Sequence, residues 1–404
     1  MSDNSKRPRR EIGASGAKPA EGWLGNFLGL DDFEVAARRH LPRMIHGYVS
    51  GAVETGSALA NARAGYQRLA LVPHTMMDVS KRQQDCELFG RRYSSPFGIA
   101  PLGGAAMVAY RGDLALADAA EAMGVPMIMS ASSLIPLEEV RRDRPNTWFQ
   151  AYLPGDQTRI DAMVDRVAAA GFDTLVVTAD TPVPGNRENN IRSGFSMPLK
   201  ITANTIIDSA LHPRWLLGVM ARTFYRHGPP HFENMDATRG PAMLSQTAVR
   251  SMGARDQLSW GHVAAIRKRW PGKLVIKGLL TAEDARKARD CGCDGVIVSN
   301  HGGRQLDHAV APIQMLPEIV DAVGPMPVMI DGGIRRGTDV IKALALGASF
   351  VFLGRPFLYA AFLGGAPAVQ HAMTLLSTEI DRDMALMGLR QLSELNPQYV
   401  RPAP

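Results

Sequence analysis

From residue 95 onward, one pattern recurs along the chain: a short, continuously apolar run is followed by a stretch in which apolar residues have helical spacing. Continuously apolar strands that alternate with helices are typical of a parallel sheet covered by helices. Eight repeats favour a closed (β/α)8 barrel, the TIM barrel of the α/β class, over an open doubly wound sheet. The predicted strands are Pro96–Pro101, Pro126–Ala131, Thr147–Leu153, Thr174–Asp180, Lys273–Gly278, Gly295–Asn300, Pro327–Asp331 and Ser349–Gly354.

The repeat is interrupted once, after the fourth predicted strand, by an insertion of about residues 190–258. Long insertions in such barrels occupy loops at the catalytic face. This one mixes apolar and basic side chains, which suits an active-site lid, an oligomer contact or a helix at a membrane surface; the first two are commoner in soluble enzymes. The residues of this mixture are Arg214, Trp215, Leu216, Leu217, Val219, Met220, Arg222 and Arg226.

Residues 1–25 are rich in Ser, Lys, Arg, Gly and Pro, and we expect a disordered lead there and a barrel domain over residues 26–404. The lead lacks the apolar run of a secretory signal peptide. The three cysteines neither form a disulfide framework nor have zinc-site spacing, so we expect a cytoplasmic protein with reduced thiols and no metal site. The net charge of +6 comes partly from the lead, which we interpret as solvated rather than as a nucleic-acid site; a weak polyanion or membrane contact is the alternative.

Polar groups follow the carboxyl ends of five successive predicted strands, where TIM-barrel enzymes carry their reactive residues. Strand four ends at Asp180, strand five at Lys277, and strand six is followed by His301 and Arg304. A histidine can take up a proton near neutral pH, an arginine offers a planar fork to a carboxylate, and an aspartate can orient the imidazole. The pattern predicts proton removal beside a bound carboxylate, against the alternative of a structural histidine. Lys277 is a structural ion-pair residue, a Schiff-base lysine or a cation facing an electron-rich cofactor.

The ends of predicted strands seven and eight are typical of a phosphate site. Gly332, Gly333 and Gly354 allow backbone N–H groups to approach an anion, and Arg335 and Arg355 add positive charge. A helix is expected to begin directly after each turn, and TIM barrels often bind phosphate at these two strands. The alternative is a pair of ordinary glycine turns with surface arginines.

The chain contains, in order, the motifs LPRMIHGYVSGA, FGIAPLGGAAM, TWFQAY, TADTPVPGNRE, VIKGLL, SNHGGRQLD, DGGIRRGTDVIKALALGA and GRP. This series resembles the FMN-dependent L-2-hydroxy-acid oxidase/dehydrogenase family, which includes glycolate oxidase and the L-lactate and mandelate dehydrogenases. The resemblance covers about residues 31–390, and several independent motifs in order make it specific. It implies one FMN, whose single phosphate agrees with the predicted anion site. No GxGxxG motif indicates a Rossmann-bound dinucleotide.

The resemblance also implies roles for individual residues. His301 would be the catalytic base, with Asp180 behind it and Lys277 facing the flavin. The substrate would be held by Tyr48, Tyr152, Arg187 and Arg304. The isoalloxazine would be lined by Pro101, Leu102, Gly103, Ser130, Gln150 and Thr178. The ribityl phosphate end would be held by Ser299, Asp331, Gly332, Gly333, Arg335, Gly354 and Arg355.

The activity implied is FMN-dependent oxidation of a lactate- or mandelate-like L-2-hydroxy acid to the 2-oxo acid, with electrons passed to a quinone, another carrier or O2. The alternatives are an oxygen-using oxidase, a non-oxidising FMN barrel isomerase and a non-catalytic flavin carrier. Gly103 resembles the dehydrogenase members more than the alanine of several oxidases, which argues against fast oxygen use. The insertion resembles that of membrane-associated members, so the inner membrane surface is an alternative location. The family also implies a homo-oligomer, a tetramer or octamer.

Overall fold

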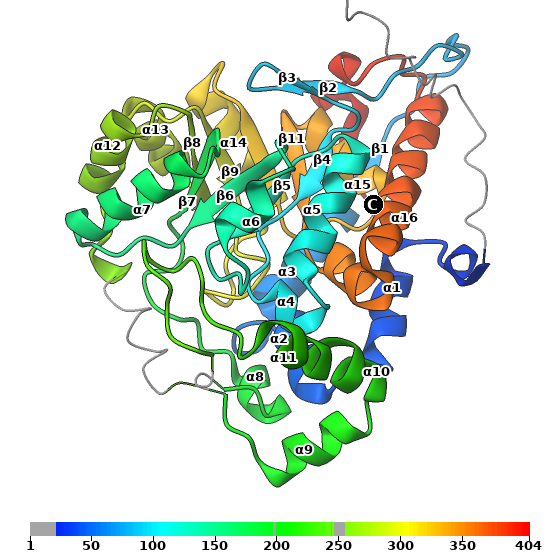
Figure 1. The fold of residues 1–404 in the computed structure, drawn as a ribbon. Helices are drawn as coiled ribbons and strands as arrows, with labels where there is room; N and C mark the ends of the chain where they lie inside the picture. Colours follow the sequence, from blue (N-terminus) through cyan, green and yellow to red (C-terminus); the bar gives the residue numbers. More distant parts are fainter. Residues whose placement is uncertain (1–21, 197–198, 244, 246–254) are drawn as a thin grey trace, which may run out of the picture.

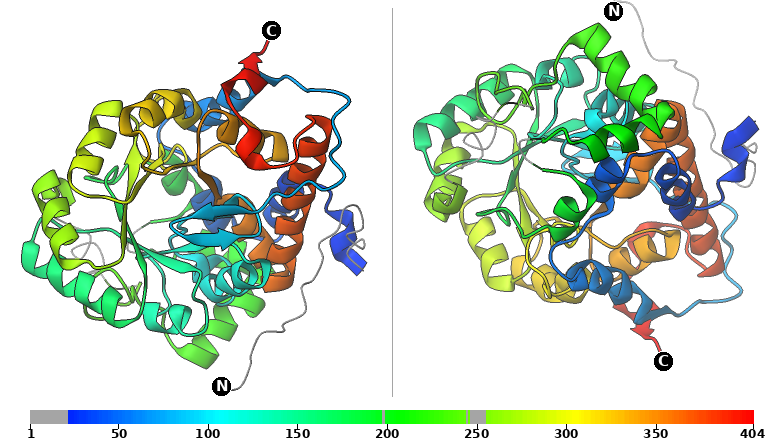
Figure 2. Two further views of the ribbon diagram at one scale, coloured as in Figure 1. Left: turned by 90° about the horizontal axis from the view of Figure 1, so that it is seen from above. Right: turned by 90° about the horizontal axis from the view of Figure 1, so that it is seen from below.

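Eight parallel strands close into a barrel in the order β4-β5-β6-β7-β8-β9-β10-β11 (Figures 1 and 2). The computed structural model describes residues 22–404 except 197–198, 244 and 246–254. Each strand overlaps one predicted run, so the TIM barrel is confirmed. The strands are β4 (Phe97–Ile99), β5 (Met127–Ser130), β6 (Thr147–Ala151), β7 (Thr174–Thr178), β8 (Lys273–Leu279), β9 (Gly295–Val298), β10 (Val328–Asp331) and β11 (Phe350–Leu353).

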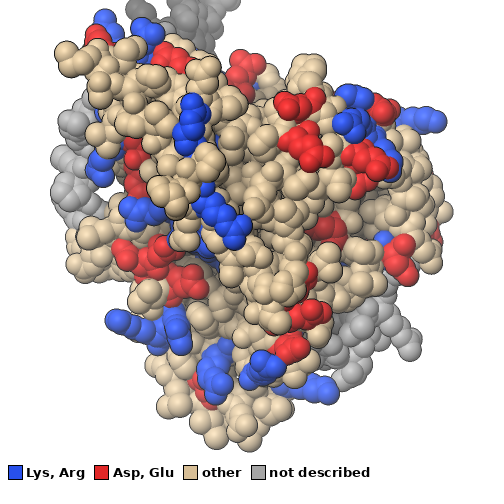
Figure 3. All heavy atoms as spheres, turned by 180° about the vertical axis from the view of Figure 1, so that it is seen from behind, with Lys and Arg blue, Asp and Glu red and all other residues tan. Residues whose placement is uncertain are grey.

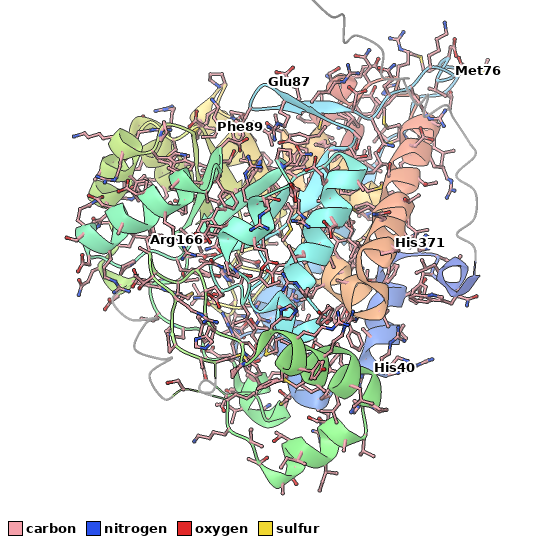
Figure 4. The ribbon with its side chains drawn as sticks, viewed as in Figure 1. His40, Met76, Glu87, Phe89, Arg166 and His371 are labelled. Atoms are coloured by element: carbon pink, nitrogen blue, oxygen red, sulfur yellow. The ribbon has the colours of Figure 1, made fainter. Side chains whose placement is uncertain are left out.

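The barrel interior is a packed apolar layer, because alternate residues of each strand point inward. Its members include Ala100, Ile128, Trp148, Val176, Val275, Ile297, Met329, Phe350 and Phe352. The hairpin of β2 (Cys86–Leu88) and β3 (Arg91–Tyr93) lies across the amino-terminal end of the barrel (Figure 2, left). Phe89 at its tip, labelled in Figure 4, lies 5.7 Å from Trp148 between ring centroids. That end is therefore closed by side chains, which leaves the carboxyl end for chemistry.

Helices surround the barrel and bury their apolar faces against it. Helix α7 begins at a typical N-cap residue: the Asp156 side chain accepts a hydrogen bond from the Arg159 amide and so satisfies a backbone donor of the first turn. α16 is interrupted at Gly364 and Gly365, and it packs against both α5 and α1. The surrounding helices are α5 (Gly112–Met123), α6 (Leu137–Arg141), α7 (Gln157–Ala169), α12 (Trp260–Arg269), α13 (Ala282–Asp290), α14 (Pro312–Val323), α15 (Gly337–Ala345) and α16 (Arg355–Leu386).

Elements from both chain ends complete the domain. The described chain starts with a 3-10 helix, η1 (Gly22–Asn26), so the last residues of the predicted 1–25 lead are helical; residues 1–21 lie outside the described residues. The reason is aromatic packing, because the Trp23 ring meets Phe27 edge-on at 5.5 Å. Near the other end, β1 pairs antiparallel with β12. These elements are α1 (Leu30–Arg38), α2 (Arg43–Ser50), α3 (Ser57–Gln67), β1 (Leu69–Leu71), η5 (Leu392–Glu394), η6 (Pro397–Tyr399) and β12 (Val400–Pro402); the short helix α4 (Ala105–Val108) lies between β4 and α5.

The insertion is helical and lies at the carboxyl end of the barrel, at the bottom of Figure 1. Trp215 anchors it, because this side chain is buried and its Nε1 donates a hydrogen bond to the Met107 carbonyl at 3.0 Å. Among the described residues, no helix is both long enough and apolar enough to cross a membrane. The described elements are α8 (Glu188–Ser193), α9 (Ala203–Ala210), α10 (Pro213–Trp215), the π-helical turn η2 (Leu216–Ala221), α11 (Arg222–His227) and η4 (Arg255–Gln257).

Candidate active site

A cavity of about 860 Å³ opens at the carboxyl ends of the barrel strands. The floor of the cavity is formed by strand side chains that point into the barrel. Every second side chain of a strand points to the same side, so the residue two positions after an inward-pointing one points inward as well. Each of six core residues is therefore followed, two positions later, by a polar side chain at the top of the barrel. These polar residues are Ser130, Gln150, Thr178, Lys277, Ser299 and Asp331.

Most of the predicted site residues line this one cavity, although they come from segments far apart in the sequence. Four do not line it: Ser130, Gln150 and Ser299 lie buried in its floor, and Asp180 lies behind His301. The lining residues that were predicted are Tyr48, Pro101, Leu102, Gly103, Tyr152, Thr178, Arg187, Lys277, His301, Arg304, Asp331, Gly332, Gly333, Arg335, Gly354 and Arg355.

His301 and Asp180 form a hydrogen-bonded pair, with 2.8 Å between Nδ1 and Oδ1. Burial lowers the pKa of His301 below its ordinary value, and the Asp180 charge only partly opposes this. Burial alone would raise the pKa of Asp180, but the His301 charge and hydrogen bond, together with Lys277, hold it below the usual value. A neutral imidazole that donates Nδ1–H to an ionised carboxylate leaves Nε2 free to accept a proton. Nε2 lies 3.4 Å from the Tyr152 hydroxyl.

Lys277 is a buried residue whose side chain carries a positive charge. Its Nζ lies 2.8 Å from Asp331 Oδ2 and donates a hydrogen bond of 2.8 Å to Ser299 Oγ. Burial disfavours the charge, but Asp331 and then Asp180 raise the pKa above its ordinary value. Lys277 therefore stays protonated at neutral pH. A Schiff base would require a neutral amine, so the ion-pair and cofactor-facing interpretations are the ones that this geometry favours.

Two arginines reach the cavity from the loops after β7 and β9. The Nη1 of Arg304 donates to the Gly51 carbonyl at 2.8 Å, and its guanidinium lies 5.3 Å from the Tyr48 ring centroid. Arg187 donates from Nε to the Arg304 carbonyl at 3.0 Å and from Nη2 to Gln305 Oε1 at 2.7 Å. Burial first, and then the nearby charges of Arg187 and Arg355, lower the pKa of Arg304 to about 9. A carboxylate bound here would relieve that repulsion.

Unpaired polar atoms in the cavity floor test whether a flavin fits. Among the described residues, Gln150 Nε2 and Thr178 Oγ1 are buried and have no hydrogen-bond partner. The other end of the Gln150 amide is fixed, because Oε1 accepts a hydrogen bond from Ser130 Oγ at 3.0 Å. A buried polar group without a partner costs about 1–3 kcal/mol. The carbonyl and ring-nitrogen edge of an isoalloxazine offers the missing partners, so these residues fit the group that the sequence predicts.

The ends of β10 and β11 form the predicted anion cradle. Gly333 has φ +84°, and a Cβ there would lie 2.3 Å from the Ala62 carbonyl oxygen, so no other residue fits this close approach. Helix α15 begins shortly after it and α16 begins at Arg355, as predicted. The two arginines are tethered: Arg355 Nη2 donates to the Gly302 carbonyl at 2.9 Å, and Arg335 Nε lies 3.3 Å from Asp31 Oδ1. Burial, followed by the charge of Arg335, lowers the pKa of Arg355 to about 10.

Several cavity residues were missed by sequence reasoning. Outside the cavity lining, Asp307 accepts hydrogen bonds from the Thr55 and Ala58 amides at 2.9 Å each, which ties the loop after β9 to the start of α3. The insertion contributes Phe195, Phe232, Met243 and Arg255. The one usable signal was that a long insertion after strand four lies at the catalytic face, which does not say which of its side chains point inward.

The fold and the cavity define a TIM barrel with a histidine–aspartate pair, two arginines that could bind a carboxylate, and a glycine–arginine turn that could hold an anion such as a phosphate. The family model of the FMN-dependent dehydrogenases matches residues 37–402. The chain belongs to this family, and FMN is its cofactor.

Similar proteins and solved structures support the same family assignment. The chain is 37% identical to (S)-mandelate dehydrogenase from Pseudomonas putida over 93% of its own length and 94% of the relative's. It is 39% identical to L-lactate dehydrogenase from Caulobacter vibrioides over 90% and 95%. The crystal structure of the monotopic membrane protein (S)-mandelate dehydrogenase superposes with a TM-score of 0.88 at 37% identity, covering 94% of this chain and 100% of that one. The protein is thus an oxidoreductase acting on CH–OH groups, as predicted.

Proposed function

We propose that the protein oxidises an L-2-hydroxy acid of the lactate or mandelate kind to the 2-oxo acid, with His301 as the base. The observation that carries this proposal is the His301–Asp180 pair facing the cavity that Arg304 also lines. An isomerase that uses flavin without net oxidation would not need a base beside a carboxylate clamp. The relatives named above act on mandelate and lactate by name, and they support the same reaction class.

In this mechanism the protein binds, orients and deprotonates the substrate. Arg304, with Arg187 beside it, would hold the carboxylate, and Tyr48 and Tyr152 would contact its oxygens. His301 Nε2 would take a proton from the substrate, and Asp180 would stabilise the resulting imidazolium. When bound, FMN supplies the acceptor for the two electrons. Lys277 would hold positive charge beside it, and Gln150, Thr178, Gly333 and Arg355 are among the residues that would bind it.

The test is an anaerobic absorbance titration of the FMN-loaded protein with glycolate, L-lactate, L-mandelate and a long-chain 2-hydroxy acid in turn. We expect one of these acids to bleach the flavin band, and slow recolouring in air to indicate a dehydrogenase. Rapid recolouring would instead make the protein an oxidase. His301→Ala should keep its flavin and lose bleaching. Normal bleaching by this variant would remove His301 as the base.

The proposed electron acceptor is a membrane quinone, reached by docking of the insertion on an anionic membrane surface. Exposed apolar side chains gather on α9 to α11 and the segment before them, and basic side chains lie among them; Lys and Arg are prominent at this end of the molecule in Figure 3. That combination is typical of interfacial binding. The apolar residues are Ile201, Ile206, Ile207, Leu211, Leu217 and Tyr225, and the basic ones Lys200, Arg214, Arg222 and Arg226.

Sedimentation with phosphatidylglycerol vesicles tests the docking. We expect the wild type to pellet with them and the Ile206→Glu, Leu211→Glu double variant to stay in the supernatant. Leu386→Glu is the matched control, because Leu386 is equally exposed but ends α16, away from the insertion. If wild type and double variant pellet alike, the insertion does not dock on the membrane. The tetramer or octamer that the family implies is tested separately by light scattering.

A further inference from the structure

A third arginine reaches the substrate side of the cavity. Arg255, the first residue of η4, lines the cavity and places its guanidinium carbon 4.4 Å from the centroid of the Tyr152 ring. The Tyr152 ring lies in turn 6.4 Å from the His301 ring, between centroids. Arg255 and His301 therefore both lie beside Tyr152, and both line the cavity in which the hydroxy acid would bind.

Arg255 has no ion-pair partner within the described chain, where no carboxylate lies within 4.0 Å of it. Among the described side chains, its hydrogen-bond contact is a weak one of 4.0 Å to the Met235 sulfur. Burial lowers the pKa of Arg255. Tyr152 covers one face of the guanidinium, but stacking uses the face only and leaves the N–H edges available for planar, bidentate recognition of a carboxylate.

The other charges of the cavity are already accounted for. Lys277 pairs with Asp331, and His301 with Asp180. Under the proposed function, Arg304 and Arg187 take the substrate carboxylate, while Arg335 and Arg355 belong to the phosphate end. Arg255 is thus the cavity cation to which neither the described chain nor the proposed 2-hydroxy-acid core assigns an anion. The insertion also gives the cavity wall three buried apolar side chains: Phe195, Phe232 and Met243.

We propose that Arg255 binds a second carboxylate at the distal end of the substrate, so that the enzyme prefers dicarboxylic L-2-hydroxy acids. This proposal rests on the proposed function and adds to it only the identity of the distal group. A partly buried guanidinium without an ion-pair partner favours an anion, because the anion replaces the water that the guanidinium has lost. An apolar chain end offers no such replacement.

A matched pair of five-carbon acids tests it in the FMN-loaded enzyme: L-2-hydroxyglutarate, with two carboxylates, and L-2-hydroxyvalerate, with one. We expect the wild type to favour the dicarboxylate in kcat/KM. Arg255→Met should reduce kcat/KM for the dicarboxylate by about 10- to 100-fold, the usual value of a charge-assisted hydrogen bond, and leave the monocarboxylate nearly unchanged. Arg255→Lys should recover part of the loss. Arg286→Met, on the exposed face of α13, is the matched control and should change neither substrate.

A binding measurement without turnover separates this proposal from the proposed function. The flavin spectrum is titrated with 2-oxoglutarate and with 2-oxovalerate, and Arg255→Met should weaken only the former. Equal kcat/KM of both acids in the wild type, or an equal loss for both in Arg255→Met, would overturn the proposal and make Arg255 a support for Tyr152. If no hydroxy acid reduces the flavin, the proposed function fails. In that case selective loss of 2-oxoglutarate binding would still support the Arg255 site, and unaltered binding would overturn it.

Discussion

Replacing Asp180 by asparagine isolates the electrostatic part of the proposed base. The substitution keeps the size of the side chain that faces His301 Nδ1 at 2.8 Å and removes its charge. Both side chains are largely buried, at 17% exposure for His301 and 14% for Asp180, so solvent screens the pair only weakly. A hydrogen bond to a charged group contributes about 1.5–3 kcal/mol. The Asp180 charge stabilises the imidazolium that forms as His301 accepts the proton. Without this charge, the rate of flavin reduction in Asp180→Asn should fall about 10- to 100-fold. The loss can reach about 10⁴-fold if the amide also holds the imidazole in the wrong tautomer.

The pH profile gives a second, independent signature. Burial lowers the pKa of His301, and Asp180 opposes that effect through its charge and its hydrogen bond. Removing Asp180 therefore lowers the pKa of His301 further. Because a base must be neutral to act, kcat/KM rises with pH through the pKa of the free enzyme. In a plot of kcat/KM against pH, the rising acidic limb of the variant should therefore lie at lower pH than that of the wild type. The plateau of kcat/KM at high pH should also be lower in the variant.

The assay is anaerobic stopped-flow reduction of the bound flavin by the best substrate, across the pH range in which histidine titrates. Asp165→Asn is the control, since Asp165 pairs with Arg269 on the surface and should change neither plateau nor limb. A limb that stays in place or moves to higher pH while the rate falls would refute the coupling of Asp180 to His301. An unchanged rate would refute the pair as the proton acceptor.

Three further substitutions probe the remaining parts of the site. Lys277→Met leaves the Asp331 carboxylate buried without its cation. The free energy of unfolding should therefore fall by about 3–5 kcal/mol, and the flavin should be lost on gel filtration. An unchanged melting temperature would contradict the buried pair. Arg304→Lys removes the fork but not the charge, so KM should rise more than kcat falls in steady-state kinetics, and an unchanged KM would argue against a carboxylate clamp. Gly333→Ala places a Cβ 2.3 Å from the Ala62 carbonyl oxygen at φ +84°, so FMN affinity measured by fluorescence should drop, and wild-type affinity would exclude the cradle.

The sequence predicted the barrel because the pattern that encodes it is local. A buried parallel strand must be apolar along its whole length and a surface helix on one side only, and both periods can be read without knowing the fold. Gln150, by contrast, was implied only by the family resemblance. The structure explains its place, since Gln150 follows Trp148 and Lys277 follows Val275 by two positions, so both lie just above the core. His301 and Arg304 could be named because chemistry in a TIM barrel gathers at strand ends.

Only the tertiary structure decided which polar groups are paired and which are not. The partners of Lys277 and His301, Asp331 and Asp180, lie 54 and 121 positions away in the chain, and no local pattern records that they meet. The 3-10 helix η1 (Gly22–Asn26) likewise includes an aromatic contact, between Trp23 and Phe27, that composition does not record. Arg255 lies in an irregular insertion, where neither helical nor strand periodicity fixes the direction of a side chain. Burial and charge pairing are properties of the folded whole, because they are set by atoms that the chain brings together only when it closes the barrel.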